Sequence, residues 1–355
     1  MGILKKLGIE GGEDDVSGWL LMICEPGLPL IQQSAMLTPS PNFMRTFILV
    51  LAVTGIFALH SPSLRAEPTN SAVAIPVGKL AFVTSKGFGY PGKIRFIAGQ
   101  HQTTTLAYET RDLEFLPDGR QLIYSANDPH TNGMFVYDLA SHTSRQVWPP
   151  VGREEAPCVS PDGSHIAFVR YAPHGSDIYI ANADGSDARQ LTSDQKFNWS
   201  PRWSPDGRQI LFETTRNDDA QASGHKGGGH RDAYVMDPDG GHPTNLTPNN
   251  YGHQPSWSPD GKATAYMSRG PKGSCNIFVM HADGSAKQDI SHGTTRDSEP
   301  VWSPDGQWIA FTRTVEHPTG GESMDIWLMK SDGTEQTQVT FNETTVTSYS
   351  PRWGR

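Results

Sequence analysis

The side chains of this chain best suited to chemistry are histidines, carboxylates and one amide. They are Asp112, Glu155, Gln254, Glu299, His130, His174, His253, His292 and His317. Imidazole nitrogens and carboxylate oxygens hold divalent metals in proteins. A fold that brings these side chains together would form a polar binding face able to hold such a metal. The alternative is that histidine is simply tolerated in exposed loops, in which case no cofactor is expected.

A second candidate metal set lies in and beside the segment 223–231, whose sequence is SGHKGGGHR. His225 and His230 lie inside this segment, and Asp232 follows it. The glycines resemble a phosphate-binding loop, but the GxxxxGK[ST] spacing is missing and no helix is predicted to follow. The sequence therefore disfavours a nucleotide site, and a flexible loop is the alternative to a metal site.

Serine hydrolase chemistry is disfavoured by the sequence. The G-x-S-x-G motif of a nucleophile elbow is missing from the 355 residues. Ser160, Ser204, Ser258 and Ser303 instead recur at one position of a repeated motif. We therefore predict structural roles for these serines and name no catalytic residue.

The repeated motif organises the segments that must position the polar side chains. It reads PRWSPDG at 201–207, PSWSPDG at 255–261 and PVWSPDG at 300–306, with weaker copies at 157–163 and 113–119. Proline and aspartate suit the early positions of a turn, and glycine takes the positive φ that closes it. The glycines fall at 119, 163, 207, 261 and 306, so the spacings are 44, 44, 54 and 45 residues. A second Asp-Gly turn in each of the later repeats, at 184–185, 239–240, 283–284 and 332–333, predicts a second hairpin. Two hairpins per repeat at this period are typical of a β-propeller blade.

We predict an all-β fold, a six-bladed β-propeller of four-stranded blades over residues 79–355. The blades are expected at 79–108, 111–148, 154–192, 198–247, 252–291 and 297–340. Blade one has three predicted strands, at 79–85, 93–97 and 104–108, and the C-terminal sequence YSPRW at 349–353 matches the strand that it lacks. We expect the C-terminal strand to complete blade one and close the ring, because closure protects exposed strand edges.

The connections between strands predict where binding takes place. The Asp-Gly turns are short and uniform, whereas the loops after the second strands vary in length, with the longest at 214–231 and 314–324. Variable loops on a rigid scaffold are typical binding sites. We therefore place the functional face on the side of these loops, together with the histidines and carboxylates named above.

Charge and hydropathy narrow the range of partners and compartments. The formal net charge is −9 and the basic residues are scattered, so a nucleic-acid partner is not expected. The apolar run 47–59 follows Met44 and Arg45 in the pattern of a signal peptide, which we place at 44–66. Residues 1–43 are then a mis-assigned or unstructured extension, and 67–78 a short linker. An uncleaved anchor is the alternative; after cleavage we expect a monomer without a membrane span.

The blade pattern resembles the WD-like repeats of the TolB family, whose blades read W-SPDG-x-x-IAF, then DIY-x-M, then DG. The corresponding residues stand at 302–311, 325–329 and 332–333, and the likeness covers about residues 79–353. The resemblance implies a periplasmic or secreted protein of a Tol-Pal-like system, with an envelope partner such as a peptidoglycan-associated lipoprotein. The family's α/β domain ahead of the propeller is not expected here, because few residues separate the predicted signal peptide from the first strand.

Three functional interpretations stay open. The first is a non-enzymatic scaffold that binds another protein in the cell envelope. The second is a metal-dependent lyase or hydrolase that acts on acidic oligosaccharides at the channel mouth, because similar blades occur in oligogalacturonate lyases. The third is a carbohydrate-binding module.

Overall fold

The computed structural model describes residues 75–87, 92–98, 101–128, 131–149, 151–216, 231–248, 251–270 and 273–354, with side chains for all of these except 101–109, 127–128 and 131–132. They belong to one compact unit, Asn70–Arg355. The predictions for residues 1–43, 44–66 and most of 67–78 lie outside the described residues, as do those for His130, His225 and His230. The described residues include no helix long and apolar enough to cross a membrane.

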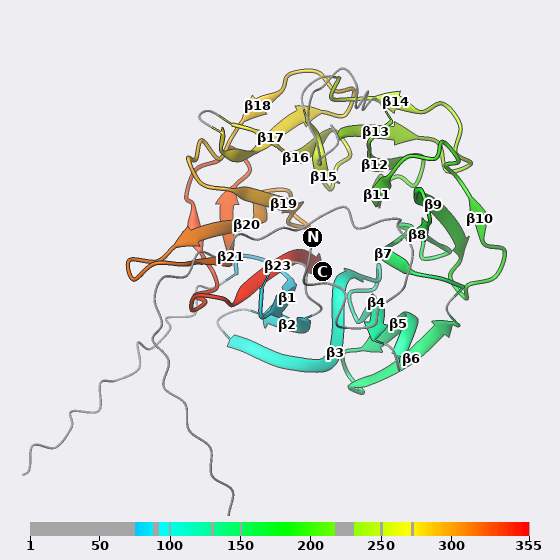
Figure 1. The fold of residues 1–355 in the computed structure, drawn as a ribbon, viewed down its shortest axis with the longest axis horizontal. Helices are drawn as coiled ribbons and strands as arrows, with labels where there is room; N and C mark the ends of the chain where they lie inside the picture. The colour runs from blue at the N-terminus through cyan, green and yellow to red at the C-terminus, as the bar shows by residue number, and fades with distance from the viewer. Residues whose placement is uncertain are drawn as a thin grey trace, which may run out of the picture. The chain divides into compact units, whose positions relative to one another are not determined.

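Four-stranded antiparallel sheets are the building units of the fold (Figure 1). Three of them are separate sheets with their strands in chain order. The first comprises β7 (Glu154–Val159), β8 (His165–Ala172), β9 (Gly175–Asn182) and β10 (Arg189–Gln190). The second comprises β11 (Asn198–Trp203), β12 (Ile210–Thr214), β13 (Asp232–Met236) and β14 (Thr244–Asn245). The third comprises β15 (His253–Trp257), β16 (Ala263–Arg269), β17 (Cys275–His281) and β18 (Gln288–Asp289).

The other strands join into one eleven-stranded sheet. Its N-terminal strands are β1 (Lys79–Ser85), β2 (Gly92–Ala98), β3 (His101–Phe115), β4 (Gln121–Asp128), β5 (Thr131–Asp138) and β6 (Thr143–Trp148). Its C-terminal strands are β19 (Asp297–Trp302), β20 (Trp308–Glu316), β21 (Glu322–Lys330), β22 (Thr337–Gln338) and β23 (Thr347–Gly354). The described residues therefore form an all-β fold, as predicted, and no α-helix occurs among them.

The SPDG turns explain why the first two strands of each sheet pair in a fixed register. The Ser303 hydroxyl donates to Asp305 Oδ1 (2.6 Å) and accepts from the backbone N–H of Trp308 (2.9 Å). Gly306 completes the turn at φ 70°, a conformation that costs glycine little. The same two serine bonds recur at Ser160, Ser204 and Ser258. The predicted structural role of these serines is confirmed.

Strand β3 differs from the prediction. The sequence predicts a separate strand at 104–108 and a new blade from 111, but β3 runs without a break through 15 residues. It pairs with β2 as far as Thr110 and with β4 from Thr110 onward. The segment contains no proline or glycine to end the strand, so the chain passes from one sheet into the next in an extended conformation.

The C-terminal strand β23 lies beside the N-terminal strand β1. The two pair antiparallel, with Leu80 opposite Trp353 and Thr84 opposite Ser348. All eight residues of β23 are buried. β23 also contacts β3 and β19, so this strand lies inside the fold.

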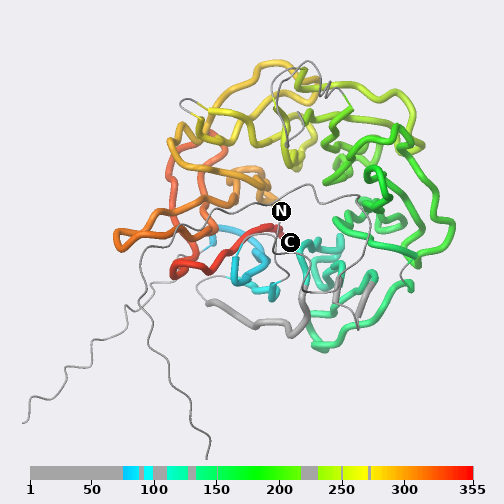
Figure 2. Tube along the Cα trace, in the orientation of Figure 1, coloured from blue at the N-terminus to red at the C-terminus, as the bar shows by residue number. Residues whose placement is uncertain are grey.

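Six strands meet at the centre of the described unit, where Figures 1 and 2 show them converging. They are β3, β7, β11, β15, β19 and β23, and each contacts the next in this order. Hydrophobic clusters fill the spaces between neighbouring sheets: Trp257 of β15 packs with Leu211 of β12 and Tyr266 of β16. The central strands are therefore held on a rigid support, with their own side chains left to line the centre.

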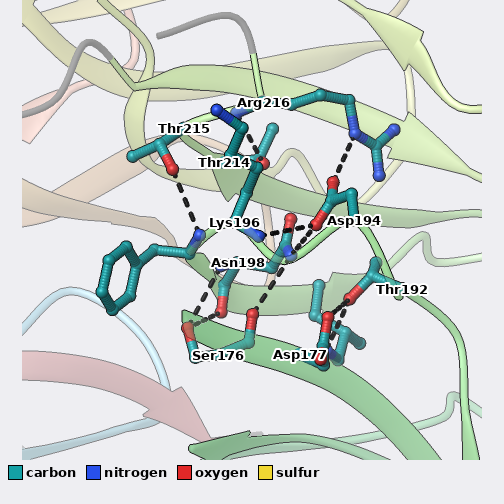
Figure 3. A network of polar contacts seen from close by, with 11 residues as sticks. Ser176, Asp177, Thr192, Asp194, Lys196, Asn198, Thr214, Thr215 and Arg216 are labelled. Atoms are coloured by element: carbon teal, nitrogen blue, oxygen red, sulfur yellow. Dashed lines mark hydrogen bonds and ion pairs between the residues drawn. The ribbon is translucent and has the colours of Figure 1, made fainter. Parts of the chain in front are cut away.

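A partly buried polar network anchors strand β11 to the preceding sheet (Figure 3). Asn198 donates from Nδ2 to the carbonyl of Ser176 (3.1 Å) and to Asp194 Oδ1 (3.0 Å). Arg216 donates from Nε to Asp194 Oδ2 (2.6 Å). Burial raises the pKa of Asp194, but the hydrogen bonds from Asn198 and Arg216 outweigh it and hold the pKa below its ordinary value. The network fixes where β11 enters the centre.

Candidate functional site

Each central strand carries a bulge that turns one side chain towards the centre. The pairing of every central strand with its neighbour shifts register at this point. In five of the six strands the bulged residue has a positive φ of 48–55°, and these residues are Ala156, Ser200, Gln254, Glu299 and Ser350. Asp112 holds the equivalent place in β3, between Thr110 and Leu113. β-Bulges re-aim side chains in this way near functional sites.

The bulged residues line a central cavity of about 290 Å³. Four of the predicted binding residues, Asp112, Glu155, Gln254 and Glu299, all lie in its wall. The structure thus brings together residues that are up to 187 positions apart, from 112 to 299. Residues that were not predicted complete the wall, and they include Arg111, Tyr171, Trp199, Glu213, Arg231, Tyr349 and Ser350.

Two further cavities continue from the first. The second, of about 80 Å³, shares Asp112, Gln254 and Glu299 with the first, and adds Arg202 and Arg352. The third, of about 250 Å³, shares Arg202 with the second and is lined by Glu114 and several tryptophans. Glu114 lies 3.9 Å from Arg202 and 3.4 Å from Arg352. The centre therefore has a first layer with four carboxylates and the guanidinium groups of Arg111 and Arg231, followed by a layer with the guanidinium groups of Arg202 and Arg352.

Hydrogen bonds from bulge to bulge hold three of the wall residues in place. The backbone N–H of Gln254 donates to Glu213 Oε2 (2.8 Å), and the N–H of Glu299 donates to Gln254 Oε1 (3.2 Å). The N–H of Ser350 donates in turn to Glu299 Oε2 (2.7 Å), and the hydroxyls of Ser350 (3.1 Å) and Thr312 (2.9 Å) donate to the same carboxylate. Gln254 and Glu299 therefore help to hold the central strands together.

Neighbouring arginines compensate the negative charges of Glu155 and Glu213. Arg153 Nη2 lies 2.9 Å from Glu155 Oε1, and the Tyr171 hydroxyl donates to Glu155 Oε2 (3.0 Å). Burial and the Glu155 carboxylate raise the pKa of Tyr171 above its ordinary value, so the phenol stays a donor. Arg231 Nη1 lies 3.0 Å from Glu213 Oε1. Both glutamates are thus fixed by donors from the wall or its rim.

Asp112 differs from the other wall carboxylates. Within the described residues its hydrogen bonds involve only the backbone, with Thr110 Oγ1 as the partner. Burial, together with the carboxylates of Glu155 and Glu299, raises its pKa from the ordinary 3.8 to about 6. Asp112 therefore takes up a proton close to neutral pH, unlike an ordinary aspartate.

The predicted histidines do not gather at the cavity. His253 lies beside one wall residue, with Nδ1 3.9 Å from Glu213 Oε2, but does not line the cavity itself. His174 is exposed, and His292 is exposed beside Asp289. His317 lies in the β20–β21 turn, where Nε2 is 2.9 Å from the Ser323 hydroxyl. The convergence expected from the sequence is therefore seen for the carboxylates and the amide.

The second metal candidate is placed only in part, because His225 and His230 lie outside the described residues. Asp232 is 1% exposed at the start of β13, and it accepts from Asn245 Nδ2 (2.9 Å). Its carboxylate thus links β13 to the neighbouring strand β14. Within the described ranges, no three His, Cys, Asp or Glu side chains lie close enough to hold a metal ion together.

Aromatic rings covered by guanidinium groups lie in and beside the cavity wall. Arg231 lies 4.1 Å from the ring centroid of Trp199, and Arg153 lies 4.2 Å from that of Tyr171. Phe197 is 42% exposed and stacks on Trp199, with centroids 5.1 Å apart and planes at 6°. We call Phe197, Trp199, Arg231, Arg153 and Tyr171 the aromatic rim.

Some missed wall residues carried a signal in the sequence and others did not. Ser200 and Ser350 precede proline in the repeated motif, as Gln254 and Glu299 do, so the repeat alone could have identified them. Glu213 and Arg231 lie at the end of β12 and just before β13, at the borders of the long variable loop. Only the pairing of those strands brings them to the cavity.

Comparison with known proteins places the chain in a family. Residues 80–270 and 249–354 match the model of the TolB beta propeller domain. An uncharacterized protein of Agrobacterium fabrum is 33% identical over 107 residues, 30% of this chain and 34% of that protein. The Tol-Pal system protein TolB of Alcanivorax borkumensis is 36% identical over 58 residues, 16% of this chain and 13% of that protein. The matches thus span about a third or less of these relatives.

Solved structures of low sequence identity share the fold. TolB from Acinetobacter baumannii matches with a TM-score of 0.64 at 18% identity, over 78% of this chain and 66% of that chain. A chain of the nidogen/laminin complex matches with a TM-score of 0.60 at 10% identity, over 79% of this chain and 99% of that chain. These likenesses concern the fold alone. Because the family model covers most of the described residues, the chain belongs to the family of the TolB beta propeller domain.

Proposed function

We propose that the sheets form a six-bladed propeller closed by β23, which supplies the first strand of the blade that contains β1 and β2. Two observations support this closure. β23 pairs with β1, and the contacts among the central strands lead from β3 through β7, β11, β15 and β19 to β23 and back to β3. The cavity then lies on the propeller axis, with one bulged strand of each blade around it.

We propose that this propeller is a scaffold that binds another protein, and the aromatic rim carries the proposal. Tryptophan, tyrosine and arginine are the residues enriched in the energetic centres of protein interfaces. Here Trp199 and Tyr171 line the cavity, each with a guanidinium over its ring, and Phe197 adds an exposed ring that stacks on Trp199. Rings that are already held in place lose little conformational entropy on binding.

The relatives support the compartment and the class of partner. Two of them, from Alcanivorax borkumensis and Rhizorhabdus wittichii, are Tol-Pal system proteins. We propose by analogy that this protein acts as a monomer in the periplasm or outside the cell, with a peptidoglycan-associated lipoprotein or a similar envelope protein as its partner.

The proposal is tested by calorimetric titration of the purified protein with the soluble domain of the peptidoglycan-associated lipoprotein from the same organism. We expect saturable binding, weakened at least about tenfold by Trp199→Ala, as for a residue worth roughly 1.4 kcal/mol or more. Phe341→Ala is the matched control, because Phe341 is 53% exposed and lies outside the cavity wall. Absence of binding by the unmodified protein, or equal loss in both variants, would contradict the proposal.

A further inference from the structure

We infer that the central cavity recognises a positively charged nitrogen group, a lysine ammonium or an arginine guanidinium of the bound protein, with Asp112 as its counter-ion. The source of the cation rests on the proposed function, whereas the chemistry of recognition rests on the cavity alone. The four carboxylates in the cavity wall differ in the hydrogen-bond donors that they have.

Three of the four carboxylates in the cavity wall already accept hydrogen bonds from donors of the protein itself. Glu155, Glu213 and Glu299 each accept from at least two donors of the protein. Within the described residues, no donor contacts the carboxylate of Asp112, although Asp112 lines both the 290 Å³ and the 80 Å³ cavity. An ionised carboxylate that is partly removed from water and lies near other carboxylates is destabilised unless a cation joins it. A ligand cation would supply that missing partner.

A second buried group in the same cavity also lacks a partner. Ser256 is 6% exposed, and its hydroxyl has no hydrogen-bond partner within the described residues. It lines the 80 Å³ cavity together with Asp112. Buried hydroxyls are almost always bonded to protein, water or ligand. An ammonium group has three N–H donors, so it can bond Asp112 and still offer a donor to a neighbouring hydroxyl.

The layer beneath Asp112 limits how far a cation can enter. Arg202 and Arg352 line the small cavity together with Asp112, and Arg352 is only 7% exposed. Two guanidinium groups repel a further positive charge, and the carboxylate that they face, Glu114, is already shared between them. Arg111 and Arg231 also line the 290 Å³ cavity, but each lies beside a glutamate: Arg111 is 3.8 Å from Glu155 and Arg231 is 3.0 Å from Glu213. This cavity holds four carboxylates and two guanidinium groups, so a cationic side chain would enter it from the aromatic rim and stop at Asp112.

Binding of a cation should be linked to proton release. The groups that set the pKa of Asp112 at about 6 are its burial, Glu155 and Glu299, which raise it, and Arg352 and Arg202, which lower it. A cation beside Asp112 favours the ionised form and lowers this pKa. Near pH 6, where about half of the free protein is protonated at Asp112, binding should therefore release about half a proton.

The test is a calorimetric titration of the full chain with N-acetyl-lysine methylamide and N-acetyl-arginine methylamide. N-acetyl-norleucine methylamide serves as the uncharged control of similar shape, and calcium chloride tests a metal ion. At pH 8 we expect at least one cationic probe to bind in the millimolar range and the norleucine probe not to bind. Affinity should fall about tenfold at pH 5, one unit below the pKa, because about a tenth of Asp112 is then ionised.

Variants separate the role of Asp112 from general effects of charge. Asp112→Asn should reduce binding of the cationic probe at least tenfold and abolish its dependence on pH, whereas Asp112→Glu should retain the pH dependence. Glu316→Gln is the control, because it removes one negative charge at an exposed position outside the cavity wall. Ser256→Ala should weaken the ammonium probe and leave the fold intact.

Each outcome decides between the inference and its alternatives. Equal binding of lysine and norleucine probes, unchanged binding by Asp112→Asn, or tighter binding of calcium than of either cationic probe would overturn the inference. If Asp112→Asn still binds the lipoprotein domain as the unmodified protein does, the inference fails while the proposed function stands. If the lysine probe binds as expected but the lipoprotein domain does not, the cavity chemistry stands and the proposed partner is wrong.

Discussion

Replacing Asp112 by asparagine should stabilise the unligated protein at pH 8. Asparagine has nearly the same shape but no charge, so it removes the cost of keeping an ionised carboxylate beside Glu155 and Glu299. The backbone bonds of residue 112 to Thr110 do not depend on the carboxylate. A gain in stability from a substitution in a cavity wall is the pattern expected where binding is favoured at the expense of folding.

The pKa of Asp112 gives the size and the sign of the effect. Folding raises this pKa from 3.8 to about 6, roughly two units, and each unit corresponds to about 1.4 kcal/mol. Because the folded-state pKa is the higher one, the cost is absent below pH 3.8, grows between the two values, and is fully present above pH 6. Asp112→Asn should therefore gain about 3 kcal/mol at pH 8 and almost nothing near pH 4.

Thermal melting followed by circular dichroism measures this difference. At roughly 2 °C per kcal/mol for a domain of this size, the melting temperature of Asp112→Asn should rise by about 6 °C at pH 8. The gap to the unmodified protein should close as the pH falls through 6 towards 4, whereas Glu316→Gln should show no such dependence. A variant that melts at or below the unmodified protein at pH 8 would refute the reasoning, as would a gap that does not change with pH.

Three further predictions concern the support of the cavity. Glu299→Ala leaves the Ser350 N–H and two hydroxyls without their acceptor, so urea titration should show a loss of about 2–3 kcal/mol. Asp194→Asn should cost about 2 kcal/mol at pH 7, and the loss should vanish as the pH falls below 3.8 through the lowered pKa; a loss that persists there would contradict the assignment. Deletion of residues 347–355 removes a strand that is buried throughout, so the whole unit should melt far lower, and an unchanged melting temperature would argue against closure by β23.

The repeat unit made much of the fold predictable from local sequence. The SPDG turns appear where the motif places them, because proline, aspartate and glycine each suit one position of a tight turn. Ser303 and its three equivalents take the predicted structural role. The break expected between 108 and 111 is wrong, because no residue in β3 prevents the extended conformation from continuing.

The same repeat made part of the site predictable. Asp112, Gln254 and Glu299 occupy one position of the unit, and Glu155 precedes that position, so any ring-like arrangement of units brings them together. The histidines have no fixed place in the repeat: His174, His292 and His317 lie in connections whose path is not set by the unit. The repeat therefore could not show whether these histidines lie close together.

The sequence by itself determined the strands, their turns and the position that each unit presents at the centre, because these depend on residues close together in the chain. Only the tertiary structure decided which of those residues lack a partner within the protein and so remain available to bind a ligand. Glu299 is occupied because the bulge of β23 presents an N–H to it, and Glu213 is occupied because the bulge of β15 does the same. Asp112 has no such donor within the described residues, and this difference arises from contacts between segments far apart in the chain.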